Sequence, residues 1–274
     1  MTPTSGLIAT TTTEPAPVAT PGEEAVVVEV VDGDTFKVRF DDGRGERVRL
    51  IGVDAPEVGE CHSDRSTAAL RDLIGGRRVT LVRDESDRDR YGRLLRYVFV
   101  GTDPPVFVNA ALAEGGDVIS RRYDPDTSRQ AELEAAQDRA HQQGLGLWAP
   151  DACGVQVPDT TNTGTPRIVR VEYDAPGNDN LNLNGEWAEL GAGASGPVDL
   201  TGWVLKDASA SHRYHFPPGF TIPAGGTIRV FTGCGPDTAT ELHWCNQGSA
   251  VWNNSGDTAF LLDPSGNIVD SMSW

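Results

Sequence analysis

Residues 26–57 read VVVEVVDGDTFKVRFDDGRGERVRLIGVDAPE and contain three apolar runs separated by turn residues. The runs cover Val26–Val31, Thr35–Phe40 and Glu46–Ile51, and β-branched side chains occur in all of them. Runs of this kind bounded by Asp and Gly are typical of β-strands, and the Asp-Asp-Gly triplet at 41–43 favours a tight hairpin turn. We therefore predict three consecutive strands at the start of the folded chain.

The region that follows predicts the rest of this domain. Apolar periodicity and capping residues indicate three helices, over 63–74, 108–114 and 128–143, each followed by glycine. Two more strands are expected over Arg78–Val82 and Leu94–Val100. Five strands with helices at one end predict an α+β fold, a five-stranded barrel of the oligonucleotide/oligosaccharide-binding (OB) type with three helices.

Changes of composition divide the chain. Residues 1–24 are dominated by Thr, Pro and Ala and predict a disordered leader. Residues 154–165 are polar and predict a linker that few contacts cross, after a first domain at 25–153. Over 166–274 the helical signal vanishes, and short apolar runs alternate with Gly, Pro, Asn and Asp turns. This second domain is predicted to be an all-β sandwich, so the protein is multi-domain.

The chain is acidic, with a formal net charge of −17 over 274 residues. This balance argues against passive adhesion to nucleic acid, because such binding draws on neutralisation of phosphate charge. It is compatible with an enzyme that has a bound cation and a local arginine cluster, and arginines do cluster at 88–96 and 121–122. No apolar run reaches the length of a bilayer span, so we expect no membrane span. The leader lacks the charged and apolar regions of a secretion signal.

The chain contains four cysteines, Cys61, Cys153, Cys234 and Cys245. No C-x-x-C spacing occurs, which argues against a zinc site. An even count, with one pair in each proposed domain, favours the disulfides Cys61–Cys153 and Cys234–Cys245 and a secreted or cell-surface protein. The alternative is four free buried thiols.

Three polar segments carry residues suited to phosphodiester chemistry: DGDT at 32–35, RLIGVDAPE at 49–57 and DRYGR at 89–93. Asp34 and Asp54 supply the hard oxygen ligands that Ca²⁺ prefers. Glu57 follows a rigid Ala-Pro step and could orient or deprotonate a water. Arg49 and Arg93 carry planar guanidinium groups that match phosphate oxygens.

Each of these segments has a structural explanation when it is taken alone. Asp-Gly-Asp is commonly a turn, Arg49 and Glu57 could form a surface pair, and 89–93 could be a solvated loop. Their joint presence in one barrel-like pattern favours the chemical explanation.

In order and spacing, these segments resemble the signature of the staphylococcal nuclease (thermonuclease) family over about residues 26–148, including the final GLGLW at 144–148. The resemblance implies two calcium carboxylates, Asp34 and Asp54, and a third ligand in the carbonyl of Ala55. It also implies a catalytic trio of Arg49, Glu57 and Arg93.

The same resemblance implies a nucleotide pocket lined by Tyr91 and Tyr123. Arg121 stands where a second pocket tyrosine would be, which predicts weaker base stacking and stronger phosphate contact. Ala55 stands where the staphylococcal enzyme has threonine, and we expect little effect because the backbone is the ligand.

Family members hydrolyse DNA and RNA and leave 3′-phosphate ends. The resemblance therefore implies a calcium-dependent nuclease, expected to be an endonuclease and a monomer, with nucleic acid as its substrate. The alternative is a non-catalytic nucleic-acid or protein-binding module on the same barrel. A third possibility is an adhesin with a vestigial nuclease. The presence of all five charged residues favours the enzyme.

Residues 166–274 resemble the lamin-tail domain, an immunoglobulin-like sandwich. Segments such as DLTGW at 199–203 and WNNSGD at 252–257 carry the resemblance. Tryptophans here are expected to be core aromatics with a polar handle. The resemblance implies an accessory domain that binds or anchors the enzyme to a surface or a protein partner.

Overall fold

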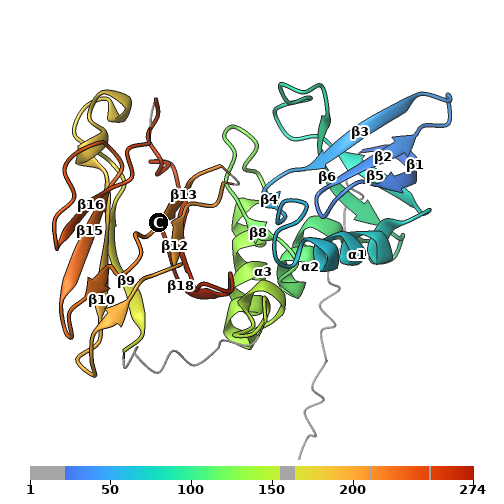
Figure 1. Cartoon of the computed structure of the whole chain (residues 1–274). Coiled ribbons are helices and arrows are strands. Elements are labelled where there is room, and N and C mark those ends of the chain that lie inside the picture. The colour runs from blue at the N-terminus through green and yellow to red at the C-terminus, as the bar shows by residue number, and fades with distance from the viewer. Residues whose placement is uncertain (1–21, 155–163, 210, 247) are drawn as a thin grey trace, which may run out of the picture.

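The computed structural model of the chain describes residues 22–154, 164–209, 211–246 and 248–274 (Figure 1). Most of the predicted leader and most of the predicted linker lie outside these residues. Two β-rich domains lie side by side, the first coloured blue to green and the second yellow to red. Within the described residues, no helix is long and apolar enough to cross a membrane.

The first domain is built around a closed barrel of five strands, as predicted. The strands are β1 (Glu23–Val30), β2 (Thr35–Arg39), β3 (Gly45–Leu50), β5 (Arg78–Val82) and β6 (Leu94–Val100). Antiparallel pairs join them in the order β3-β2-β1-β5-β6, and a parallel pairing of β3 with β6 closes the ring. A short strand, β7 (Val106–Phe107), extends the sheet beside β6.

The hairpin between β2 and β3 fixes a register that matters for the site. Phe36 and Val38 are buried, whereas Arg39 is exposed, as the alternation of a half-buried strand requires. Gly43 adopts a φ of 88° and donates its N–H to the Phe40 carbonyl at 3.0 Å, which closes the turn. With this turn, Thr35 pairs with Arg49, so the start of β2 and the end of β3 lie at one barrel rim.

Three helices pack against the barrel, as predicted: α1 (Ser63–Ile74), α2 (Val108–Gly115) and α3 (Gln130–Gln143). Leu70 and Ile74 of α1 and Leu112 of α2 are fully buried in the barrel core. Two strands of only two residues, β4 (Val53–Asp54) and β8 (Ile119–Ser120), pair beside the barrel.

The second domain is mostly β-sheet and forms a sandwich. One sheet has the order β16-β15-β10-β9 and the other β13-β12-β17-β18. The strands of the first sheet are β9 (Pro166–Glu172), β10 (Trp187–Ala192), β15 (Thr227–Phe231) and β16 (Glu241–His243). Those of the second are β12 (Val204–Lys206), β13 (Arg213–His215), β17 (Thr258–Leu262) and β18 (Ile268–Ser273). A further pair joins β11 (Val198–Asp199) to β14 (Thr221–Ile222). Both sheets contribute to one apolar core.

The two domains share an apolar cluster, so the expectation that few contacts cross between them is wrong. Trp148 at the end of the first domain lies 6.0 Å from Phe260 of β17, measured between ring centroids. Ile119 and Leu147 belong to the same buried cluster. Phe260 is fully buried. Side chains of the barrel domain complete the burial of Phe260. A sequence pattern cannot show whether an apolar residue is buried within its own domain or against another one.

Both predicted disulfides are present, Cys61–Cys153 and Cys234–Cys245. Their Cα–Cα distances are 5.4 Å and 4.0 Å. Each bridge lies within one of the two predicted domains. The first connects the loop after β4 to the segment that follows the last helix of the barrel domain.

Candidate active site

A cleft of about 720 Å³ opens at the barrel rim where β2 begins and β3 ends. It is lined by all nine residues to which the sequence assigned a catalytic, metal-binding or substrate-binding role. These are Asp34, Arg49, Asp54, Ala55, Glu57, Tyr91, Arg93, Arg121 and Tyr123. Asp34 and Tyr123, which are 89 positions apart in the chain, thus line the same cleft.

The turn before β2 holds Asp34. Asp32 accepts hydrogen bonds on one oxygen from the N–H groups of Asp34 (3.1 Å) and Thr35 (2.7 Å). Asp34 accepts from the Thr35 hydroxyl at 3.0 Å and from the Ala55 N–H at 2.8 Å. Gly33 is required because a Cβ there would lie 2.0 Å from the Ser66 hydroxyl of α1. The DGDT segment therefore presses against α1 and aims the Asp34 carboxylate at the cleft.

Arg49 of β3 lies between two aspartates. Its guanidinium donates to the carbonyls of Leu50 (2.8 Å) and Val53 (2.7 Å), which fix its plane. The same group forms ion pairs with Asp34 at 3.0 Å and with Asp54. Burial alone lowers the pKa of Arg49, but the carboxylates of Asp34 and Asp54 outweigh burial and raise it. Arg49 is therefore a permanent cation at the floor of the cleft.

Two acidic groups of the cleft, Asp54 and Glu57, have raised pKa values. Burial first, and then the charge of Asp34, raises the pKa of Asp54 against the opposing effect of Arg49. Burial also raises the pKa of Glu57, and the nearby carboxylates Asp54 and Asp34 add to this effect. A place where carboxylates raise the pKa of a neighbouring carboxyl group is one where a cation would be stabilised.

The donor set fits a hard cation. Asp34, Asp54 and the backbone at Ala55 offer oxygen ligands, which Ca²⁺ prefers and supplements with water. Within the described ranges, no three His, Cys, Asp or Glu side chains form a ready-made metal cage. The set of two carboxylates therefore suits an ion that keeps several waters.

The turn before β6 presents Arg93. Asp89 accepts from the backbone N–H groups of Tyr91 and Arg93, each at 2.9 Å, and pairs with the Arg93 side chain at 2.6 Å. Arg93 also donates to the Thr35 hydroxyl at 3.3 Å, and its guanidinium lies 5.5 Å from the centre of the Tyr91 ring. Asp89 thus shapes the turn and holds Arg93 next to the Asp34 segment.

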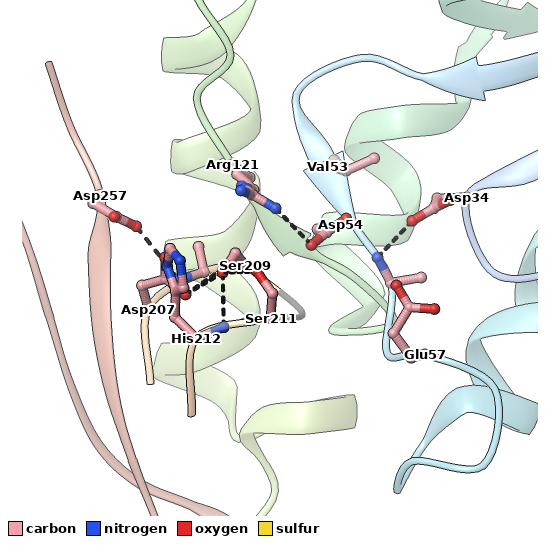
Figure 2. Close-up of polar contacts among 12 residues, drawn as sticks. Asp34, Val53, Asp54, Glu57, Arg121, Asp207, Ser209, Ser211, His212 and Asp257 are labelled. Carbon is pink, nitrogen blue, oxygen red and sulfur yellow. Dashed lines mark hydrogen bonds and ion pairs between the residues drawn. The ribbon is translucent and has the colours of Figure 1, made fainter. Parts of the chain in front are cut away.

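Arg121 and Tyr123 follow β8 on the side of the cleft toward the sandwich. Arg121 pairs with Asp54 at 3.1 Å (Figure 2). Its guanidinium also lies 4.5 Å from the centre of the Tyr123 ring. Burial, reinforced by Asp54, raises the pKa of Tyr123 to about 12, so its hydroxyl stays protonated. Arg121 is thus engaged with a metal-ligand candidate, which the sequence had not indicated.

Sequence reasoning missed several residues of the cleft. Asp32 and Asp89 lie inside the segments singled out, but their positioning roles depend on turn hydrogen bonds. Ser209 and Ser211 come from the sandwich and line the same cleft, facing the barrel residues in Figure 2. No motif marks them, so only the packing of the domains could reveal them.

The first domain is thus a small five-stranded barrel with two aspartates, a glutamate and two arginines in a cleft at its rim. Residues 47–150 match the family model described as "Staphylococcal nuclease homologue", and residues 159–274 match the model "Lamin Tail Domain".

Curated proteins match the first domain. The thermonuclease of Staphylococcus intermedius is 34% identical over 133 residues, which is 46% of this chain and 77% of that protein. An uncharacterized endonuclease of Escherichia coli O157:H7 is 35% identical over 124 residues (45% and 75%). A micrococcal nuclease of Shigella flexneri is 34% identical over 131 residues (45% and 72%). The chain belongs to the staphylococcal nuclease family, and a lamin tail domain follows its nuclease domain.

Proposed function

We propose that this protein is a calcium-dependent nuclease that hydrolyses DNA, RNA or both internally and leaves 3′-phosphate ends. The observation that carries the proposal is the convergence of Asp34, Asp54, Glu57, Arg49 and Arg93 in one cleft. Family membership and similarity to thermonucleases and endonucleases support a nuclease acting on nucleic acid.

The carboxylates of Asp34 and Asp54 and the carbonyl of Ala55 would hold the Ca²⁺ ion. When bound, this ion supplies charge neutralisation at the phosphate and lowers the pKa of a coordinated water. The hydrogen bonds of Asp34 to Thr35 and to the Ala55 N–H keep this carboxylate oriented before any ligand arrives.

The side chains divide the remaining chemistry. Glu57 orients the attacking water and accepts its proton. Arg49 and Arg93 hold the phosphoryl oxygens and stabilise the charge that develops on them. Both guanidinium groups are already fixed by protein contacts, so little ordering remains for the moment of reaction.

We further propose that Tyr91, Tyr123 and Arg121 contact the nucleotide next to the cleaved bond. Arg121 and Tyr123 form a cation–π pair, which offers a base both an aromatic face and a charge. The two disulfides support a secreted or cell-surface location, and the sandwich is proposed to attach a monomeric enzyme to a surface or protein partner. The non-catalytic alternative is disfavoured by the complete set of five charged residues and by the net charge of −17.

The test is digestion of end-labelled single- and double-stranded DNA and RNA by the purified full chain, with Ca²⁺ or with excess chelator. We expect cleavage only with Ca²⁺, internal cuts and products with a 3′-phosphate. Mg²⁺ in place of Ca²⁺ should support little cleavage, because the smaller ion holds its waters in a tighter octahedral shell. Full activity in chelator would contradict the metal assignment. Products with a 5′-phosphate would contradict the proposal that cleavage leaves the phosphate on the 3′ end.

A further inference from the structure

The loop that carries Glu57 is held by a carboxylate that also contacts the sandwich. Glu57 lies between β4 and α1, and Glu60 is three residues further on. One oxygen of the Glu60 carboxylate accepts the backbone N–H of Glu57 at 3.0 Å. The other oxygen pairs with the guanidinium of Arg213, the first residue of β13 in the sandwich. A single carboxylate therefore connects the second domain to the backbone of the proposed general base.

The other end of this loop is tied to the sandwich as well. Cys61, the next residue, is bonded to Cys153, and the Cys153 N–H donates to the Asn267 side chain at 2.8 Å. Asn267 is fully buried and is itself held by Asp263 at 2.8 Å. The Ser63 hydroxyl completes the loop by donating to the Glu60 carbonyl at 2.8 Å. The position of Glu60 is thus determined from both domains.

The sandwich also closes one side of the cleft. Ser209 and Ser211 line it, and Asp207 holds this loop by accepting from the Ser209 hydroxyl at 2.6 Å and by contacting His212 at 2.7 Å (Figure 2). Lys206 of β12, only 9% exposed, precedes this loop in the chain and lines a neighbouring cavity together with Asp54. These contacts make the sandwich a wall of the proposed active site rather than a separate appendage.

We propose that Arg213 is a positioning residue for the nuclease reaction, which acts through Glu60 to fix the backbone of Glu57. The lamin tail domain is then a structural part of the active site, in addition to any anchoring role. The proposal rests on the proposed function, because it assigns Arg213 to the placement of the general base. Placement of a catalytic group within about 1 Å can be worth on the order of 10²-fold in rate.

The test uses variants of the full chain. Arg213→Met removes the charge but keeps most of the side-chain stem. We expect kcat to fall by about tenfold or more while KM changes by less than about twofold, because substrate contacts stay in place. Arg213→Lys should restore part of the lost rate, since an ammonium can still reach one carboxylate oxygen. The matched control is Arg229→Met, which removes another arginine–glutamate pair of the sandwich, with Glu189 at 2.9 Å. Arg229 is on β15, in the sheet that lies farther from the barrel (Figure 1).

A double-mutant cycle separates positioning from general destabilisation. Glu60→Ala removes the acceptor of both contacts, so Arg213→Met should lower kcat little further in that background. Circular dichroism and thermal melting identify conditions in which every variant is folded. The inference is overturned if Arg213→Met matches Arg229→Met, if only KM changes, or if the two substitutions act additively. Failure of the nuclease proposal looks different, since the wild-type chain would then cleave none of the nucleic acids.

Discussion

Arg49 shows that the geometry of the site depends on which side chains pair with one another, and not only on which residue types are present. Its guanidinium is held by two carbonyls and two carboxylates, and it is 8% exposed. The sequence predicted a phosphate-binding arginine here from its place in the RLIGVDAPE segment. It could not predict that Arg49 pairs with both aspartates, because Asp34 and Asp54 come from opposite ends of a 21-residue segment that folds back.

Glu57→Gln is the sharpest substitution at the residue scale. Glutamine keeps the size of the side chain but cannot accept a proton, so turnover should fall by about 10²-fold or more while folding and nucleotide binding stay nearly intact. Single-turnover cleavage and equilibrium binding of a short oligonucleotide measure the two effects. Glu132→Gln, on the exposed side of α3, is the control. If Glu57→Gln keeps the wild-type turnover, another residue must orient and deprotonate the attacking water.

Glu186 predicts a pH dependence of stability in the sandwich. It is fully buried, and one carboxylate oxygen accepts from the Val251 N–H at 3.1 Å. Burial raises the pKa of Glu186 from 4.5 to about 7. The pKa of Glu186 is higher in the folded protein than in the unfolded chain, so the protonated side chain contributes to the stability of the sandwich. This contribution is complete below pH 4.5 and is lost as the pH rises through about 7.

Thermal melts between pH 4 and pH 8 should therefore show a decline in Tm over the range 4.5 to 7 that is smaller in Glu186→Gln. Asp257, whose pKa burial raises to about 6, contributes a decline of its own in both proteins. Glutamine keeps the hydrogen bond with Val251 and carries no charge at any of these pH values. Glu241→Gln, at an exposed position in the same domain, should keep the decline. An identical profile for wild type and Glu186→Gln would refute the assignment.

At the scale of elements, periodicity predicted long segments well and short ones poorly. The five barrel strands and three helices were predicted because each has several turns or alternations of apolar residues. The pair β4 and β8 was missed, since two residues carry no period. Yet β4 positions Asp54, and β8 leads into Arg121 and Tyr123. The elements that place the site were thus among the least predictable.

The Cys61–Cys153 disulfide should contribute more to stability than Cys234–Cys245. The first closes a loop of 92 residues and the second one of 11. The chain-entropy model gives about 4–5 kcal/mol for the longer loop and about 3 kcal/mol for the shorter one. Paired Cys→Ser variants, compared by thermal melting, measure the difference. The first pair should also reduce kcat because it anchors the Glu60 loop, whereas the second should not. Equal kcat losses would contradict this division.

At the scale of the whole molecule, the sequence predicted two units with few contacts between them. Each unit does have its own core and its own disulfide. The structure adds a third apolar cluster across the boundary and an ion pair from Arg213 to Glu60. Neither could be predicted, because a partly apolar surface strand has the same pattern whether water or another domain covers it. The orientation of domains depends on complementary shapes rather than on periodicity.

The shared cluster predicts that the two domains unfold together. Unfolding of either domain exposes the buried ring of Phe260 or the side chains packed against it to water, so unfolding one domain should destabilise the other. Calorimetry of the full chain should show a single transition, and loss of nuclease activity on heating should coincide with it.

Phe260→Ala should separate the transition into two and lower the temperature at which the sandwich melts. Phe216→Ala, in the sandwich's own core, is the matched control, and it should lower the transition without dividing it. Two separate transitions in the wild-type chain would show that the interface is too weak to couple the domains, and the sandwich would then have to support Glu57 through local contacts alone.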